Sequence, residues 1–169
     1  MYLSKKMRKK QIILNKIQIN NKINRIAYSI IEEYYQDKSI TLVGFDNNGY
    51  AIAQKIKNII EKEQEIKISI HKIKAIKDRE YKINPPLKQQ EIKNIFLVDD
   101  VLKSGKTIIY GIKEILTHNI ESLKTIILVN RNHNRFPIGV DYVGLNLSTT
   151  LKDHIEVVLK KDKEVVYLT

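Results

Sequence analysis

The residues best suited to chemistry in this chain lie in the run Ile95–Thr107, IFLVDDVLKSGKT. Four apolar residues lead into two adjacent carboxylates, Asp99 and Asp100, and a glycine turn and an amphipathic stretch follow. In open parallel sheets, ligands bind beyond the carboxyl ends of the strands, and a helix that begins there offers unpaired N–H groups to a phosphate. The run therefore predicts a site for a ligand that carries both hydroxyl groups and a phosphate, such as a ribose 5-phosphate unit. The predicted phosphate ligands are Lys103, Ser104, Gly105, Lys106 and Thr107.

Two other interpretations of this run compete with a ribose-phosphate site. The letters SGKT at Ser104–Thr107 also end the P-loop of nucleotide-binding proteins, but that motif needs a glycine where this chain has Asp100. A carboxylate at that position repels a triphosphate. The second interpretation is a solvated turn with a helix cap. It explains an isolated pair of acids well, but not a pair that directly follows four apolar residues and precedes SGKT.

The elements that must position these residues follow an alternating pattern. Apolar residues at helical spacing predict helices over 20–35, with Asn20 or Asn21 as the cap, over 51–60 and over 106–116. Short apolar or alternating runs predict strands over 40–45, 66–76, 95–98 and 125–129. Continuous apolar strands that alternate with amphipathic helices indicate an α/β fold, a parallel sheet with helices on both faces. Shorter strand-like pieces after Asp141 are expected to complete an edge or a small subdomain.

Two segments break this pattern. The turn Asp46-Asn47-Asn48-Gly49 follows the strand predicted over 40–45. Residues 77–91 are polar and charged and contain Pro85-Pro86, so they are predicted to form a long mobile loop of the kind that often serves function.

Composition limits the class of protein. The 169 residues are 43% hydrophobic and 29% charged, which suits one globular domain, and no apolar run is long enough to cross a bilayer. A cytoplasmic protein with a basic N-terminal extension, residues 1–18, is expected. The net charge of +11 permits RNA binding but does not diagnose it, because lysine, isoleucine and asparagine are abundant along the whole chain.

The run at Asp99–Thr107 closely resembles the 5-phosphoribosyl-1-pyrophosphate (PRPP) signature of type I phosphoribosyltransferases. The resemblance extends to the uracil phosphoribosyltransferase and pyrimidine-operon attenuator (PyrR) family, through the early helix (23–31), the turn at 44–53, and 129–138 and 141–150. It implies a single-domain parallel-sheet type I phosphoribosyltransferase fold over residues 19–169, with helices on both faces and a flexible loop over the site. It also implies a homo-oligomer, a dimer or larger.

The resemblance implies a role for each of these segments. Asp99 and Asp100 are expected to be the catalytic acids that bind the ribose hydroxyls, and the turn of Asp46, Asn47, Asn48 and Gly49 is expected to meet pyrophosphate. Lys77 and Arg79 would reach pyrophosphate from the flexible loop, and the base would lie near Asn130 and Arg131. Mg²⁺ would bind mainly through the substrate, with no direct protein ligand assigned. The reaction implied is the conversion of uracil to UMP with release of pyrophosphate.

Departures from the family pattern leave a second function open. The pyrophosphate loop of the family carries an arginine where this chain has Asn48, so catalysis is expected to be weak. The alternative is an RNA-binding regulator with UMP or PRPP as its effector, for which the candidate RNA contacts are Arg25, Arg131, His133 and Arg135. A phosphoribosyltransferase that acts on another base is a third possibility.

Overall fold

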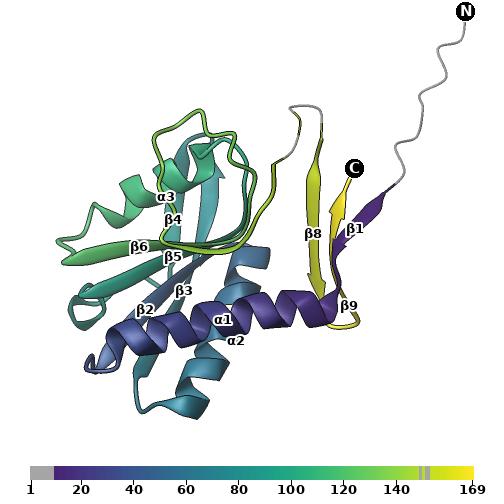
Figure 1. Ribbon diagram of the computed structural model, residues 1–169. Helices are drawn as coiled ribbons and strands as arrows, with labels where there is room; N and C mark the ends of the chain where they lie inside the picture. Colours follow the sequence, from purple (N-terminus) through teal and green to yellow (C-terminus); the bar gives the residue numbers. More distant parts are fainter. Residues whose placement is uncertain (1–9, 149, 151–152) are drawn as a thin grey trace, which may run out of the picture.

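A six-stranded sheet forms the centre of the molecule (Figure 1). The computed structural model describes residues 10–148, 150 and 153–169. The strand order is β4-β3-β2-β5-β6-β7, and every neighbouring pair is parallel except β3 and β4. The strands span Ser39–Phe45 (β2), Lys67–Lys77 (β3), Glu80–Asn84 (β4), Asn94–Leu102 (β5), Ser122–Asn130 (β6) and Tyr142–Asn146 (β7).

Helices cover both faces of this sheet, as the alternating pattern predicts. Helices α1 (Lys16–Tyr34) and α2 (Asn48–Glu63) pack on one face, and α3 (Lys106–Ile115) packs on the other. Strand β5 shows the reason, because its successive side chains point to opposite faces. Phe96 and Val98 join the core under α1 and α2, whereas Ile95 and Leu97 join the core under α3. The fold is therefore the predicted α/β type.

A second, antiparallel sheet of three strands lies beside the N-terminal end of α1 (Figure 1). Its strands are β1 (Gln11–Leu14), β9 (Lys163–Leu168) and β8 (Ile155–Lys160), in that order. The strand-like pieces expected after Asp141 thus divide between an edge of the large sheet, β7, and this small sheet. Residues near the two ends of the chain meet here, since β1 pairs with β9.

Helix α1 begins earlier than the sequence pattern predicts. Its cap is Asn15, not Asn20 or Asn21. The Asn15 side chain accepts a hydrogen bond from the Gln18 backbone N–H at 2.9 Å, and the Gln18 side chain accepts one from the Asn15 N–H at 2.9 Å. This reciprocal capping box satisfies two N–H groups that an uncapped helix leaves without partners. The boundary predicted between residues 18 and 19 therefore falls inside α1, and residues 1–9 of the expected extension lie outside the described residues.

The long mobile loop predicted over 77–91 is wrong in its first half. Glu80–Asn84 forms β4, which pairs antiparallel with β3 through a short turn at Asp78 and Arg79, and a single 3₁₀ turn, η1, spans Gln89–Glu91. The link between them is anchored from the sheet, since His71 Nδ1 donates to the Pro85 carbonyl at 2.7 Å. The prediction failed because Pro85-Pro86 and the charged residues are typical of a loop, and they outnumber the two apolar residues that indicate the strand.

In the part of the chain that the structure describes, no helix has both the length and the apolar character needed to span a bilayer.

Candidate functional site

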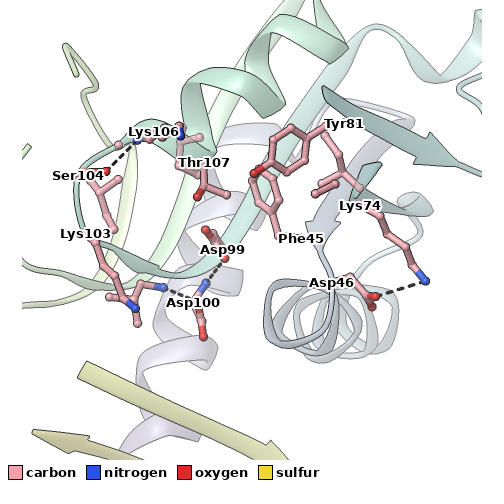
Figure 2. A pocket seen from close by; sticks show the side chains of 16 residues that line it. Phe45, Asp46, Lys74, Tyr81, Asp99, Asp100, Lys103, Ser104, Lys106 and Thr107 are labelled. Carbon is pink, nitrogen blue, oxygen red and sulfur yellow. Dashed lines mark hydrogen bonds and ion pairs between the residues drawn. The ribbon is translucent and has the colours of Figure 1, made fainter. Parts of the chain in front are cut away.

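A cavity of about 580 Å³ opens at the carboxyl ends of β2, β3 and β5 (Figure 2). From β2 the chain builds outward to β3 and β4 on one side, and later from β5 to β7 on the other, so the cavity lies where the strand order reverses. Open α/β sheets bind ligands at this switch point because the loops after two adjacent strands diverge there. The cavity is lined by Phe45, Asp46, Ile73, Lys74, Ala75, Tyr81 and the whole run Asp99–Ile108.

Asp99 and Asp100 lie at the floor of this cavity, half-buried. Strand β5 continues beyond its predicted end at Val98, because Val101 and Leu102 pair with Val129 and Asn130 of β6. The two acids therefore lie near the end of a paired strand and not in an irregular loop. Asp99 Oδ1 accepts the Asp100 N–H at 2.9 Å, and Asp100 Oδ1 accepts the Val101 N–H at 2.7 Å. Both carboxyl groups are held by backbone donors.

The two carboxyl groups differ from ordinary exposed acids in their charge balance. Burial is the larger cause and the neighbouring Asp100 charge is the second, and together they raise the pKa of Asp99 well above its usual value. Lys103 opposes this only in part. A half-buried pair of acids short of positive charge is suited to a ligand that brings hydroxyl donors or a cation.

The turn that follows β5 has the features of a phosphate site. Gly105 adopts φ +84°, a left-handed conformation that favours glycine, and α3 begins directly after it. The N–H groups in the first turn of a helix have no intrahelical partners. At the start of α3 these include the N–H groups of Thr107 and Ile108, which line the cavity and are available to a phosphate. The turn is braced from outside, since the backbone N–H groups of Arg135 and Phe136 both donate to the Ser104 carbonyl, at 2.9 and 3.1 Å.

One charge of this turn already has a protein partner. Lys106 Nζ lies 3.4 Å from Asp78 Oδ1, at the tip of the β3–β4 hairpin. Lys103 and Thr107 are exposed at the rim, and the Ser104 hydroxyl accepts the Lys106 N–H at 3.3 Å. The five predicted phosphate ligands are thus brought together in one cavity wall.

The turn between β2 and α2 reaches the opposite side of the cavity, but most of its polar groups have partners within the protein. Asp46 lies 3.3 Å from Lys74 Nζ and 3.4 Å from Lys72 Nζ. Burial pulls the pKa of Asp46 up, but the two lysines outweigh it and hold the pKa below its usual value. Asn47 precedes α2 as its N-cap residue without a side-chain cap bond, and the Asn48 side chain donates to Asp100.

Gly49 explains how closely this turn approaches the acids. A Cβ atom at Gly49 would lie 2.4 Å from the Val98 carbonyl oxygen and 3.2 Å from the Asp99 Cα. Only glycine lets the first turn of α2 rest against the end of β5. The glycine predicted to serve pyrophosphate therefore also has a packing role.

The two predicted flexible-loop charges point elsewhere. Lys77 is the last residue of β3, with its Nζ 3.8 Å from Glu80, and Arg79 has φ 62° in the hairpin turn with its Nε 3.3 Å from Asp78. Neither residue lines the described part of the cavity.

The predicted base-side residues flank the cavity without lining it. Asn130, the last residue of β6, donates from its side chain to Asn132 at 2.7 Å and to Asn146 at 3.0 Å. Arg131 is buried, its backbone N–H donates to the Leu102 carbonyl at 3.2 Å, and its guanidinium donates to the Thr150 carbonyl at 3.1 Å. The segment is thus tied to the cavity wall at Leu102.

The four candidate RNA contacts do not form one exposed group. The Arg25 guanidinium donates to the Val143 and Gly144 carbonyls at 2.7 and 2.8 Å, which attaches α1 to β7. Arg131 is buried, whereas His133 and Arg135 are exposed.

Sequence reasoning missed several residues of the cavity lining, among them Phe45, Lys74 and Tyr81. The Tyr81 and Phe45 rings pack edge to face, 5.7 Å between centroids, and form an aromatic wall. The alternation of Tyr81 and Ile83 with charged residues was the available signal for a strand here. The position of Lys74 in the cavity follows from the pairing of β3 with β2, which the local sequence does not show. Among the described residues, no group of three or more His, Asp or Glu side chains is arranged to hold a metal ion.

Comparison with known proteins identifies a family, two relatives and a solved structure that this chain resembles. Residues 11–161 match the profile of the "Phosphoribosyl transferase domain" family. The chain is 30% identical to a "Bifunctional protein PyrR" of Clostridium novyi, over 90% of this chain and 92% of that protein. It is 32% identical to a protein of the same name from Fusobacterium nucleatum, over 95% and 98% of the two chains. The crystal structure of the hypoxanthine phosphoribosyltransferase of Trypanosoma cruzi superimposes with a TM-score of 0.76, at 16% identity, over 94% of this chain and 95% of that chain.

Proposed function

Because this chain belongs to the phosphoribosyl transferase domain family, we propose that it transfers the phosphoribosyl group of PRPP to uracil, with Mg²⁺, to give UMP and pyrophosphate. The observation that carries the proposal is the single cavity wall that joins Asp99 and Asp100 to the glycine turn and the N-terminus of α3. A ribose 5-phosphate needs acceptors for its hydroxyl groups and, close by, donors for its phosphate. The end of β5 supplies the acceptors, and the start of α3 supplies the donors.

In this proposal the protein's own groups position the substrates and stabilise the charge that develops during the reaction. Asp99 and Asp100 accept hydrogen bonds from the ribose hydroxyls, and their negative charge stabilises positive charge that develops on the ribose ring as pyrophosphate leaves. The α3 N-terminus, Ser104 and Thr107 bind the 5-phosphate. Uracil N1 loses its proton to solvent or to the departing pyrophosphate and forms the new bond to the anomeric carbon as the bond to pyrophosphate breaks. Orientation of the two reactants supplies much of the rate.

The residues present fit Mg²⁺ bound through the substrate. The acidic residues of the described cavity lining, Asp46, Asp99 and Asp100, offer only oxygen atoms, which Mg²⁺ prefers. Burial and, after it, the neighbouring Asp100 charge raise the pKa of Asp99, so the pair of acids lacks compensating positive charge. When bound to pyrophosphate oxygens, Mg²⁺ supplies that charge and stabilises the leaving group.

The choice of uracil rests on the family resemblance in the sequence, and the relatives named "Bifunctional protein PyrR" agree with that family. We assign the base to the segment after β6, which Ser104 and Leu102 hold beside the cavity wall through backbone hydrogen bonds. A cytoplasmic location and self-association belong to the same proposal, and light scattering after size-exclusion chromatography tests the second.

The direct test is pyrophosphate release from PRPP and Mg²⁺ with uracil, hypoxanthine, guanine, adenine or orotate. We expect turnover with uracil alone. Turnover with another base would retain the chemistry and overturn the substrate, whereas no turnover with any base would overturn the enzymatic proposal.

A regulatory RNA-binding function is the second candidate, and Asn48 is the observation that favours it, because it stands where the family carries an arginine. Arg25 and Arg131 hold backbone carbonyls, so their replacement would disturb the fold. The cleaner variant is His133→Ala with Arg135→Ala, both exposed. An RNA regulator should lose at least about tenfold in affinity for its leader RNA at fixed salt. The control is Lys62→Ala with Lys67→Ala, two exposed lysines in the last turn of α2 and at the start of β3, which should not change it.

A further inference from the structure

Asn48 is the first residue of α2, and its side chain lies between the acids and the small sheet. Asn48 Nδ2 donates to Asp100 Oδ2 at 2.7 Å and to the Val157 carbonyl of β8 at 2.9 Å. An asparagine amide nitrogen carries two hydrogens, so these two contacts use its full donor capacity. The residue is half-buried, and the bond to Asp100 joins it to a charged acceptor, which makes it stronger than a bond between neutral groups.

This arrangement leaves the Asn48 side chain with nothing to offer pyrophosphate. Both donor hydrogens point to protein acceptors, and the remaining amide oxygen is an acceptor that repels a phosphate. The expected role of this turn position, as a pyrophosphate contact, therefore falls to the backbone alone.

We infer that Asn48 is a positioning residue, which sets the orientation of the Asp100 carboxylate and couples it to β8. Asp100 is held from two sides: Oδ1 accepts the Val101 N–H at 2.7 Å, and Oδ2 accepts from Asn48. Two donors from different elements define the plane of a carboxylate, whereas one lets it rotate. Catalytic groups need such support, because orientation within about 10–20° decides their efficiency.

The same contact gives the three-stranded sheet a role at the site. Val157 lies in β8, which pairs with β9, and β9 pairs with β1. The Asn48 amide is thus a link between the acids of β5 and a sheet built from both ends of the chain. The catalytic part of this inference rests on the proposed function, while the contact itself does not.

The contact can be tested without turnover. In ¹⁵N–¹H spectra, the side-chain amide signals of Asn48, assigned by their loss in Asn48→Ala, should be shifted downfield and exchange slowly with solvent. They should move when Asp100 is replaced by alanine. The matched internal control is Asn58, an exposed asparagine on the same helix, whose signals should exchange fast and ignore Asp100. Asn48 signals that behave like those of Asn58 would overturn the inference.

The positioning role is tested by kinetics of Asn48→Ala and Asn48→Asp, with Asn58→Asp as the control. We expect kcat/KM for PRPP to fall at least about tenfold in both variants, because a charge-assisted hydrogen bond is lost, while KM for the base is unchanged. Asn48→Asp keeps the shape and replaces the donor by a second negative charge, so it should be the more damaging of the two. Melting curves confirm that each variant folds.

Two kinetic outcomes would overturn the inference. Wild-type kcat/KM in Asn48→Ala would show that Asp100 needs no such support, and higher turnover in Asn48→Arg would show that the position still belongs to pyrophosphate. If the wild type turns over no base, the proposed function fails. PRPP affinity, measured by calorimetry in the wild type and Asn48→Ala, then decides the inference: we expect at least about a tenfold loss, and equal affinities would overturn it.

Discussion

Two turns of this molecule have the same place in the topology and different chemistry. One joins β5 to α3 and the other joins β2 to α2, and both lie at the carboxyl ends of neighbouring parallel strands. The β5–α3 turn presents an under-compensated acid pair, a left-handed glycine and a free helix N-terminus to the cavity. The β2–α2 turn directs Asp46 to two lysines and Asn48 to Asp100 and β8.

The comparison shows that topology alone does not make a ligand site. A strand end followed by a helix offers donors and a dipole in both places, but a substrate needs groups whose hydrogen-bonding capacity is not already used up within the protein. In the β2–α2 turn, Asp46 pairs with two lysines of β3, and Asn48 supports Asp100 of the neighbouring turn. The β5–α3 turn is the part left open for chemistry.

The largest expected contrast between the turns is in turnover. Asp99→Asn and Asp100→Asn should each lower kcat/KM by about 10²–10³-fold, since each removes charge aimed at the transition state. Asp46→Asn should lower it by less than about tenfold, because Lys72 and Lys74 already compensate its charge. Pyrophosphate release measures all three, with melting curves as the control for folding. An equal loss in Asp46→Asn would contradict the division of roles between the turns.

The next contrast concerns the two glycines and is measured by urea unfolding. Gly49→Ala should lower the free energy of unfolding by about 2–3 kcal/mol, because its Cβ meets the Val98 carbonyl oxygen at 2.4 Å and backbone must move. Gly105→Ala should cost about 1–2 kcal/mol through its positive φ, since the nearest atoms to its Cβ are 3.4 Å away. The reverse order would mean that the approach of α2 to β5 is less tightly packed than the structure indicates.

The acids of the two turns should affect stability with opposite sign. Burial and Asp100 raise the pKa of Asp99, so its ionisation costs stability as the pH rises from the unfolded value of about 3.9 towards the raised folded value. Asp99→Asn should therefore raise the Tm at pH 7 by about 2–4 °C and lose this advantage below about pH 4.

Asp46 behaves in the opposite way, because its pKa is lowered by the two lysines. Its stabilisation is present above the unfolded value and is lost as the pH falls through the lowered folded value. Asp46→Asn should lower the Tm at pH 7 by about 1–2 °C, and the deficit should vanish in acid. Calorimetric scans between about pH 3 and pH 8 measure both variants. A common sign for the two would refute the difference in charge balance.

The smallest expected effect is at the hairpin tip. Asp78→Asn releases Lys106 from a solvent-exposed ion pair, so the affinity of the β5–α3 turn for inorganic phosphate should rise about twofold. The control is Glu80→Gln, which removes the same charge from the same hairpin where it faces Lys77 instead. Equal gains in the two variants would assign the effect to net charge and not to Lys106.

Much of the fold was accessible from local pattern. The strands and helices around Asp99–Thr107 were predicted because continuous apolar runs indicate strands buried on both faces and apolar residues at helical spacing indicate helices. Strand β5 and helix α3 follow these patterns, although β5 extends beyond Val98. The start of α1 was misplaced, because Asn15 and Gln18 form a capping box and Asn20 resembled a cap equally well. The β3–β4 hairpin was missed because Pro85-Pro86 and the charged residues indicated a loop. In addition, its turn, Asp78-Arg79, has no glycine and places Arg79 at a positive φ.

Contiguous residues were enough to predict the α/β class, the acid pair, the glycine turn and the helix that follows it, because local propensity decides these features. Tertiary structure alone decided that Asn48 would hold Asp100, that Tyr81 and Lys74 would line the cavity, and that Arg25 would attach α1 to β7. Each of these joins residues from different elements, and such contacts depend on strand order and helix packing. A side chain's type shows what it can bind, but its partner is chosen by the fold that brings the two together.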